Sequence, residues 1–176
     1  RLATLQHVIL GECSGISVER NMKHFQHLTR LLDVLRSKSR IGGPQIRNLQ
    51  VAKALKGNID ITLVFPRKNS KVLKRQCNLL GVKYLSLSLT TIKKGLIGIL
   101  LYVFFFPYEV VMLAWILKKN NFDLVHVSGG SWQSKGIFAA KLARINVIWE
   151  LNDTYTPAIV RNIFFLISHL ADGFIY

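Results

Sequence analysis

Glycines and polar residues that follow apolar runs are the parts of this 176-residue sequence best suited to chemistry. The run at residues 123–127 is followed by Gly129 and Gly130, and the run at 145–151 is followed by Asn152 and Asp153. Glycines let the backbone approach a ligand closely, and an Asp beside an Asn offers both a proton acceptor and an amide. We therefore predict substrate contacts at Gly42, Gly43, Gly129, Gly130, Asn152 and Asp153, with Asp153 and Asn152 as the candidates for catalysis.

Each of these features also has a simpler structural interpretation. A Gly-Gly pair before a helix can serve only to turn the chain, and an Asn-Asp pair after a strand can cap the next helix. His126 lies inside an apolar run, where a hydrogen-bonded core histidine is favoured over a catalytic one. Glu150 can face either side of its run and stays unassigned. Trp115, Trp132 and Trp149 are expected to be packing residues, with a place lining the crevice as the alternative for Trp132.

The elements that must position these residues alternate regularly along the chain. Apolar, β-branched runs predict strands, and apolar residues at helical spacing predict the segments between them. Six strands alternating with helices predict an α/β fold, a Rossmann-like open parallel sheet with helices on both faces. The predicted strands are 31–36, 59–65, 82–89, 123–127, 145–151 and 171–176, and the predicted helices are 44–57, 67–81, 133–143 and 154–170.

The order of the strands decides whether the candidate residues meet. The order 3-2-1-4-5-6, common in such sheets, makes strands one and four neighbours at the point where the order reverses. Ligands bind there, outside the carboxyl ends of the strands. This assumed order brings Gly42-Gly43 beside Gly129-Gly130, with Asn152-Asp153 at the end of the next strand.

The segment between the third and fourth predicted strands is unusually apolar. Between Lys93-Lys94 and Lys118-Lys119 it is long enough to span a bilayer, which takes about 20 residues. Glu109, Pro107 and its position between two strands of one sheet oppose a span. A core-facing helix, or a helix pair broken near Pro107, is favoured. A helix pair with one face in the membrane interface is the third alternative.

The charge of the chain favours anionic partners. Lys and Arg number 24 against 9 Asp and Glu, which gives a formal net charge of +15 at pH 7. A membrane surface, nucleic acid or a phosphorylated substrate fits this charge, but no nucleic-acid recognition motif is present, so no nucleic-acid partner is predicted. Cys13 and Cys77 lack metal-ligand spacing, and His24 with His27 has no clear third ligand. No metal site is predicted.

Three common site motifs are missing. No G-x-G-x-x-G follows the first predicted strand, no G-x-x-x-x-G-K-[ST] is present, and Ser128 and Ser131 lack the G-x-S-x-G pattern. These absences disfavour a nicotinamide site, a Walker-type nucleotide site and an α/β-hydrolase, in that order.

Several weak motifs, in the right order and at the right spacing, resemble the N-terminal, acceptor-binding domain of glycosyltransferase family 4, which has the GT-B fold. They are Gly42-Gly43-Pro44 leading into Arg47 and AKALKG, then DITLVFP, FDLVHVSGG, AAKLARINVIWELND and LADGFIY. The resemblance implies a leader at residues 1–28 outside the core and a glycosyltransferase N-terminal domain at 29–176, one half of a GT-B fold. It also implies that the donor-binding C-terminal domain is absent, so this fragment alone is expected to be inactive.

The resemblance further implies a reaction. A hexosyltransferase would move a sugar from a nucleotide-sugar donor, a co-substrate used without a cofactor, to a polysaccharide or lipid-linked acceptor in cell-surface glycan synthesis. Gly42-Gly43 would lie by the sugar and phosphates, and Ser128, Gly129 and Gly130 would line the acceptor side. Many relatives carry His-Asp where this chain has Asn152-Asp153, and some carry a histidine at Ser128. Retention of the anomeric configuration is the family expectation.

The resemblance also implies a place in the cell. Family members that act on lipid-linked acceptors dock peripherally on the cytoplasmic leaflet, so we expect a cytoplasmic location on the inner face of the membrane and an anionic membrane surface as a partner. A solvated basic face is the alternative, and the alternative to an enzyme is a non-enzymatic, membrane-associated α/β binding module. The predicted membrane contacts are Lys68, Lys71, Lys74, Arg75, Lys93 and Lys94.

Overall fold

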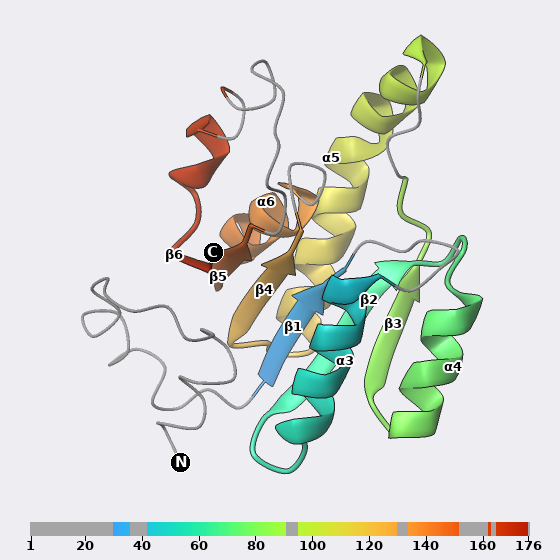
Figure 1. Cartoon of the computed structure of the whole chain (residues 1–176). Coiled ribbons are helices and arrows are strands. Elements are labelled where there is room, and N and C mark those ends of the chain that lie inside the picture. The colour runs from blue at the N-terminus through green and yellow to red at the C-terminus, as the bar shows by residue number, and fades with distance from the viewer. Residues whose placement is uncertain are drawn as a thin grey trace.

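Six parallel strands form the centre of the molecule, which is seen here as a computed structural model (Figure 1). The structure describes residues 30–35, 42–90, 95–129, 134–151, 162 and 165–175. The strand order is β3-β2-β1-β4-β5-β6, which confirms the predicted order and makes β1 and β4 neighbours at the point of reversal. The strands are β1 (Arg30–Val34), β2 (Asp60–Pro66), β3 (Lys83–Leu87), β4 (Leu124–Ser128), β5 (Asn146–Glu150) and β6 (Gly173–Ile175).

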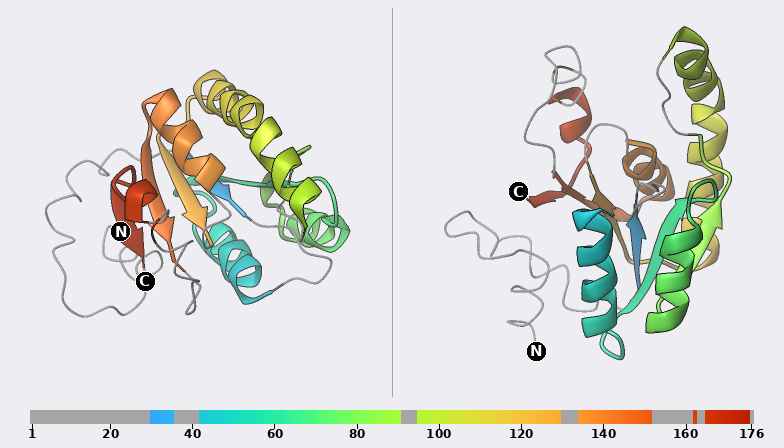
Figure 2. Two further views of the ribbon diagram at one scale, coloured as in Figure 1. Left: turned by 90° about the horizontal axis from the view of Figure 1, so that it is seen from above. Right: turned by 45° about the vertical axis from the view of Figure 1, so that its right-hand side comes forward.

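Helices cover both faces of this sheet (Figure 2). They are α3 (Gly43–Ala54) and α4 (Lys71–Leu80) on one face, and α5 (Leu96–Lys119) and α6 (Ser134–Ala143) on the other. Because alternate residues of a strand point to opposite faces, the sheet supplies two apolar cores. Leu31 and Leu63 belong to the core under α3 and α4, and Val34 and Val64 belong to the core under α5 and α6. The predicted α/β class is confirmed.

Local chemistry sets the ends of α3 and α4. The backbone N–H of Gly42 donates to the side chain of Gln45 (N···O 2.9 Å), and this bond fixes the start of α3. The prediction begins the next helix at residue 67, but a turn precedes α4, because Asn69 has a φ of 59°. α4 ends at Gly81, whose φ of 63° lies in the left-handed region that glycine adopts without strain.

A glycine lets α6 lie close against the sheet. A Cβ atom on Gly136 would stand 2.9 Å from Cγ2 of Val127 and 3.2 Å from Cγ2 of Val34. Any larger side chain there would push the helix away from β4 and β1. The close contact holds the start of α6 next to the end of β4.

α5 is one continuous helix whose two halves have different surroundings. In its second half, Val110, Leu113 and Leu117 are buried against the sheet and α6. Its first half extends past the carboxyl ends of the strands (Figures 1 and 2). There Ile97 and Phe104 are each 76% exposed. The predicted break near Pro107 is wrong, because this proline lies inside the helix without ending it.

The two strands that α5 connects decide between a membrane span and a core-facing helix. The helix is long and apolar enough to cross a membrane, yet it joins β3 to β4 of the same parallel sheet. A span would separate these strands, so the structure argues against it. The core-facing alternative describes the second half of α5. Trp149 is 1% exposed, as predicted, whereas Trp115 of α5 is 58% exposed, so the packing role predicted for it is wrong.

Some predictions fall outside the described residues. They are the leader at 1–28, the last residue of the first predicted strand with the beginning of its loop (36–41), the pair Lys93-Lys94, Trp132 and most of the predicted helix at 154–170. Within that last range, residue 162 and residues 165–168 are helical.

Candidate functional site

Three ionisable side chains lie on one face of the sheet, towards the carboxyl ends of its central strands. Asp33 of β1 and His126 of β4 are partners in register, and Glu150 is the last residue of β5. Glu150 pairs with Ser128, two residues beyond His126, so strand alternation puts all three on the same face. That face is the one that α3 covers. The residues therefore meet at the point of reversal, where parallel sheets bind ligands.

The imidazole of His126 stands between two carboxylates. Its Nδ1 lies 3.1 Å from Oδ1 of Asp33, and its Nε2 lies 3.4 Å from Oε2 of Glu150. The guanidinium of Arg47, from α3, pairs with the other oxygen of Glu150, Oε1. We call these four residues the carboxyl-edge cluster. The carboxylates of Asp33 and Glu150 are each 4% exposed, whereas the Arg47 side chain is 50% exposed.

Hydrogen-bonding rules restrict the protons in this cluster. An ionised carboxylate only accepts hydrogen bonds, so Asp33 favours the tautomer of His126 that carries its proton on Nδ1. Nε2 of His126 and Oε2 of Glu150 are both buried, and neither has a hydrogen-bond partner among the described residues. The cluster is thus arranged to orient an imidazole and to accept a proton. In the part of the chain that the structure describes, no group of three or more His, Cys, Asp or Glu is placed to hold a metal ion.

A second charged cluster lies on the opposite face of the sheet. Lys135, in the first turn of α6, pairs with Glu109 of α5, and its Nζ donates to the carbonyl and hydroxyl oxygens of Thr90, both at 2.8 Å. Glu109 also accepts from the backbone N–H of Thr90 at 2.7 Å. The Lys135 ammonium is 3.9 Å from the centre of the Tyr102 ring. Burial lowers the pKa of Lys135, although Glu109 opposes the shift. With its charges paired, this cluster ties α5 and α6 to the chain after β3.

The predicted glycines at the start of α3 lie close to the carboxyl-edge cluster along the chain. Gly42 precedes α3 and Gly43 begins it. Arg47, which pairs with Glu150, lies in the same helix. A Cβ atom on Gly43 would have no neighbour within 4 Å, so this backbone is open to approach.

The predicted residues after β4 reach the same edge of the sheet. Ser128 ends β4 and is 2% exposed, and Gly129 follows with a φ of 127°, which favours glycine. The N–H of Gly129 donates to the backbone carbonyl of Glu150 at 3.1 Å. Its own carbonyl accepts from Nε1 of Trp149 at 3.0 Å. Gly130, Asn152 and Asp153, which include both predicted catalytic residues, lie outside the described residues.

The motifs in the sequence do not reveal Asp33 or Glu150, although a signal for them is present. Each of the strand sequences LLDV, LVHV and VIWE holds one ionisable residue among apolar ones. Such a residue in a buried strand needs a polar partner. Only the strand register shows that these residues are partners of one another. His126 is hydrogen-bonded, as the core interpretation expects, but its side chain is 14% exposed and stands beside the edge.

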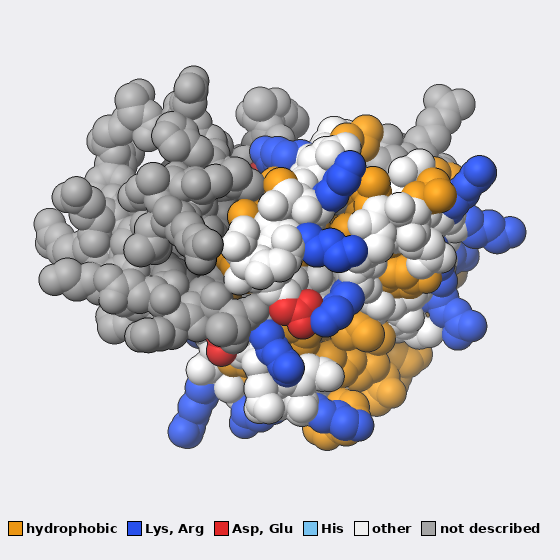
Figure 3. All heavy atoms as spheres, turned by 90° about the horizontal axis from the view of Figure 1, so that it is seen from below, with side chains coloured by type: hydrophobic (Ala, Val, Ile, Leu, Met, Phe, Trp, Pro, Cys, Tyr) orange, Lys and Arg blue, Asp and Glu red, His pale blue; other side chains and the backbone are white. Residues whose placement is uncertain are grey.

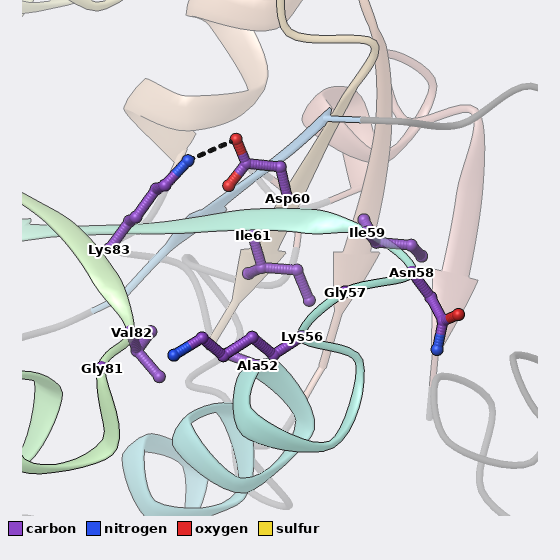
Figure 4. A pocket seen from close by; sticks show the side chains of 10 residues that line it. All are labelled: Ala52, Lys56, Gly57, Asn58, Ile59, Asp60, Ile61, Gly81, Val82 and Lys83. Atoms are coloured by element: carbon purple, nitrogen blue, oxygen red, sulfur yellow. Dashed lines mark hydrogen bonds and ion pairs between the residues drawn. The ribbon is translucent and has the colours of Figure 1, made fainter.

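A hollow lies at the opposite, amino edge of the sheet (Figure 4). Its volume is about 510 Å³, and it is lined by residues at the ends of α3 and α4 and at the starts of β2 and β3. Ile59 and Ile61 give it an apolar lining, and Lys83 pairs with Asp60 at its rim at 2.7 Å. Because ligands of parallel sheets bind at the carboxyl edge, we favour the carboxyl-edge cluster as the functional site.

Comparison with solved structures identifies the fold. A glycosyltransferase from Rickettsia africae superimposes with a TM-score of 0.59 and 18% identity, over 78% of this chain and 34% of that one. MurG from Acinetobacter baumannii gives a TM-score of 0.61 and 16% identity, over 83% and 40%. A UDP-GlcNAc 2-epimerase from Neisseria meningitidis, bound to UDP-GlcNAc, gives 0.57 and 18% identity, over 81% and 39%.

These likenesses establish a Rossmann-like α/β fold that matches one half of a GT-B fold. The chain spans only 34% to 40% of the length of these three proteins. No protein-family model matches the sequence, and no curated protein sequence matches it significantly. Assignment to glycosyltransferase family 4 therefore stays a prediction.

Proposed function

We propose that this chain is the acceptor-side part of a glycosyltransferase that uses a nucleotide-sugar donor. The observation that carries the proposal is the carboxyl-edge cluster, which lies at the β1–β4 reversal point of half a GT-B fold. A proton-accepting group at that place suits transfer to a hydroxyl, because the acceptor oxygen must lose its proton as it bonds to the sugar. The likeness to a protein bound to UDP-GlcNAc supports a nucleotide sugar as the donor.

The acceptor that fits best is a polysaccharide or lipid-linked glycan made at the cytoplasmic face of the membrane. Gly42 and Gly43 would lie by the donor phosphates at the start of α3, where Gly43 can offer its backbone N–H, since that of Gly42 already donates to Gln45. Ser128, Gly129 and Gly130 would line the acceptor side. Asn152 and Asp153 follow β5 in the chain and would contact the sugar beside Glu150.

The test is acceptor-dependent release of nucleoside diphosphate by the native-length protein. A set of nucleotide sugars is incubated with and without lipid-linked or oligosaccharide acceptors, and both diphosphate and glycosylated product are measured. We expect release only when donor and acceptor are both present. Conversion of the nucleotide sugar into its epimer, without release of diphosphate, would instead assign an epimerase. The absence of both reactions would favour a binding module.

A substitution at Asp153 tests the catalytic role predicted for this residue. Asp153→Ala should lower kcat, by about 100-fold or more if the carboxylate acts as a base, and leave the thermal unfolding midpoint unchanged. Asp60→Ala at the amino edge is the matched control and should keep wild-type kinetics. Unchanged kinetics in the Asp153 variant would reduce this residue to a helix cap.

We also propose that the first half of α5 docks the protein on an anionic membrane. Leu96, Ile97, Leu100, Val103 and Phe104 are each 59% to 76% exposed, and this half of the helix stands beyond the carboxyl edge of the sheet. An apolar helix half in contact with water is the kind of surface that enters the headgroup region of a bilayer. The net charge of +15 adds attraction to acidic lipid. Docking there would bring the candidate site close to a lipid-linked acceptor.

The basic residues of α4 flank this surface and do not share it. Lys71, Lys74 and Arg75 belong to α4, which covers the face of the sheet opposite to α5. Lys68 and Lys71 stand at the carboxyl edge, and both are exposed. Figure 3 looks onto the opposite, amino edge of the sheet, where Lys and Arg side chains lie around an area of apolar side chains. The electrostatic part of docking would come from basic side chains at the carboxyl edge, such as Lys68 and Lys71, at about 1 kcal/mol for each Lys or Arg near the lipid.

Vesicle flotation tests the docking proposal. The wild-type chain should float with vesicles that contain acidic phospholipid and less well with neutral vesicles. The double substitution Leu100→Asp/Phe104→Asp should abolish flotation. Val72→Asp/Leu79→Asp is the matched control, because these α4 residues are also exposed, at 46% and 68%. Loss of flotation in the control alone, or equal binding by all variants, would contradict docking through α5.

A further inference from the structure

The hollow at the amino edge of the sheet has the size of a small-molecule site. Its volume is about 510 Å³, and ligand pockets in proteins range from about 300 to 1,000 Å³. Ile59, Ile61 and Val82 form its apolar lining, and all three are buried residues. Among the described residues that line it, none belongs to the carboxyl-edge cluster or to α5. A ligand bound there would therefore be additional to the donor and acceptor of a transferase.

One charged group in this hollow has no counter-charge. The side chain of Lys56 extends from the end of α3 across the hollow towards the end of α4 (Figure 4). A Cβ atom on Gly81 would stand 2.7 Å from Nζ of Lys56, so the ammonium occupies room that this glycine leaves. No carboxylate among the described residues pairs with Lys56, whereas Lys83 donates to Asp60 at 2.7 Å. The hollow thus contains one paired and one unpaired lysine.

The turn that follows α3 adds a backbone donor beside Lys56. The N–H groups of Lys56, Asn58 and Ile59 donate to carbonyls of the preceding turn. The N–H of Gly57, which also lines the hollow, has no acceptor among the described residues. Figure 3 shows many Lys and Arg side chains on this side of the molecule, so the surrounding potential also attracts negative charge. This wall of the hollow is suited to an anion.

Two helix ends limit how much negative charge the hollow can take. α3 and α4 both end beside it, and the C-terminus of a helix carries about half of a negative charge. A single carboxylate balances the ammonium of Lys56, whereas a phosphate dianion would be repelled by both helix ends. The apolar lining favours a hydrocarbon group next to the charge, because contact with it removes that group from water.

We infer that the hollow binds a small carboxylate that carries an apolar chain. The carboxylate accepts from the ammonium of Lys56 and from the N–H of Gly57, and the chain lies against Ile61 and Val82. The pair between Lys83 and Asp60 stays intact at the rim. This binding does not depend on the proposed function, because the hollow lies at the edge of the sheet opposite to the candidate site.

A ligand series tests the chemical class. The full chain, labelled at the methyl groups of isoleucine, is titrated by NMR with acetate, butanoate and hexanoate. The signals of Ile59 and Ile61, identified by Ile→Val substitutions, should shift. The affinity should rise with chain length, by up to about fourfold for each methylene that leaves water. Hexanol and hexylammonium should bind more weakly than hexanoate, because neither can pair with Lys56.

Three results of this series would overturn the inference. Hexanoate that leaves both isoleucine signals unchanged would exclude the hollow as its site. Equal binding of hexanol or hexylammonium would remove the role of the charge. Binding of inorganic phosphate as tight as that of hexanoate would remove the role of the apolar chain.

A pair of lysine variants tests the position of the charge. Lys56→Met keeps most of the length of the side chain and should weaken hexanoate binding by about fivefold, the upper end for a solvent-exposed ion pair. Lys53→Met is the matched control, since Lys53 is also exposed near the end of α3 but does not line the hollow. The control should change the affinity by less than about twofold. An equal loss in the two variants would show that net charge alone attracts the ligand and would overturn the site.

Discussion

The two edges of the sheet hold ion pairs in opposite settings. At the amino edge, the side chains of Lys83 and Asp60 are 67% and 39% exposed, so water screens their charges. Near the carboxyl edge, Lys135 and Glu109 are 7% and 2% exposed. An exposed pair contributes about 0–1 kcal/mol to stability, and a buried pair carries a desolvation cost that often cancels its attraction. Buried charges are therefore poorly explained by stability alone, and their position near the carboxyl edge supports our choice of that edge as the candidate site.

The same contrast separates the hollow from the candidate catalytic site. The amino edge has the hollow of about 510 Å³, but the charges at its rim are exposed and its Lys83–Asp60 pair is complete. Near the carboxyl edge, two buried polar atoms, Nε2 of His126 and Oε2 of Glu150, have no hydrogen-bond partner among the described residues. Shape alone would select the first edge, whereas hydrogen-bond chemistry selects the second.

The largest expected difference between the edges comes from removing one partner of each ion pair. Glu109→Ala leaves the Lys135 ammonium buried without a counter-charge and should cost about 3–5 kcal/mol of unfolding free energy. Asp60→Ala should cost less than about 1 kcal/mol, because its partner is exposed. Urea denaturation measures both. Similar losses in the two variants would break the comparison.

A second substitution sharpens this test. Adding Lys135→Met to Glu109→Ala removes the orphaned charge, so much of the lost stability should return. A double variant as unstable as Glu109→Ala would show that lost packing, and not the unpaired charge, causes the effect.

A smaller difference is expected when a carboxylate becomes an amide of the same shape. Asp33→Asn keeps the size of the side chain but weakens a charge-assisted bond to His126, and it should cost about 1–3 kcal/mol. Asp172→Asn at the amino edge should cost about 0–1 kcal/mol, since Asp172 and Lys141 are each 35% exposed and the amide oxygen can still accept from the backbone N–H of Val147. Thermal unfolding of the two variants gives the comparison, and a greater loss in the Asp172 variant would contradict it.

The smallest expected effect is a pH dependence from Lys135. Burial lowers its pKa below the ordinary 10.5, so the folded protein loses this proton before the unfolded chain does as the pH rises. Between the lowered pKa and 10.5 the unfolded chain binds more protons, and stability therefore rises with pH in this window. The gain is at most about 1.4 kcal/mol for each pH unit that the window spans. Measured by urea denaturation, the unfolding free energy of the wild type should rise relative to that of Lys135→Met as the pH approaches 10.5. Parallel pH curves would argue against a lowered pKa.

The strand order and the alternation of elements could be predicted, because both follow from local patterns and from general rules for parallel sheets. The path of α5 could not, because Pro107 suggests a break that the helix does not make. The glycines beside the site could be found from their place after apolar runs. The partnership of Asp33, His126 and Glu150 could not, because their positions are 24 to 117 residues apart in the chain and only the register brings them together.

The hydrogen bond from Trp149 to the carbonyl of Gly129 gives the protein an optical reporter of its candidate site. The indole is 1% exposed, and its N–H is anchored to the first residue after β4. A ligand that moved this backbone would break the anchor and shift the emission of the buried indole. Trp115, exposed on α5, would respond instead to lipid. Fluorescence of single-tryptophan variants can thus follow occupation of the site and contact with a bilayer separately.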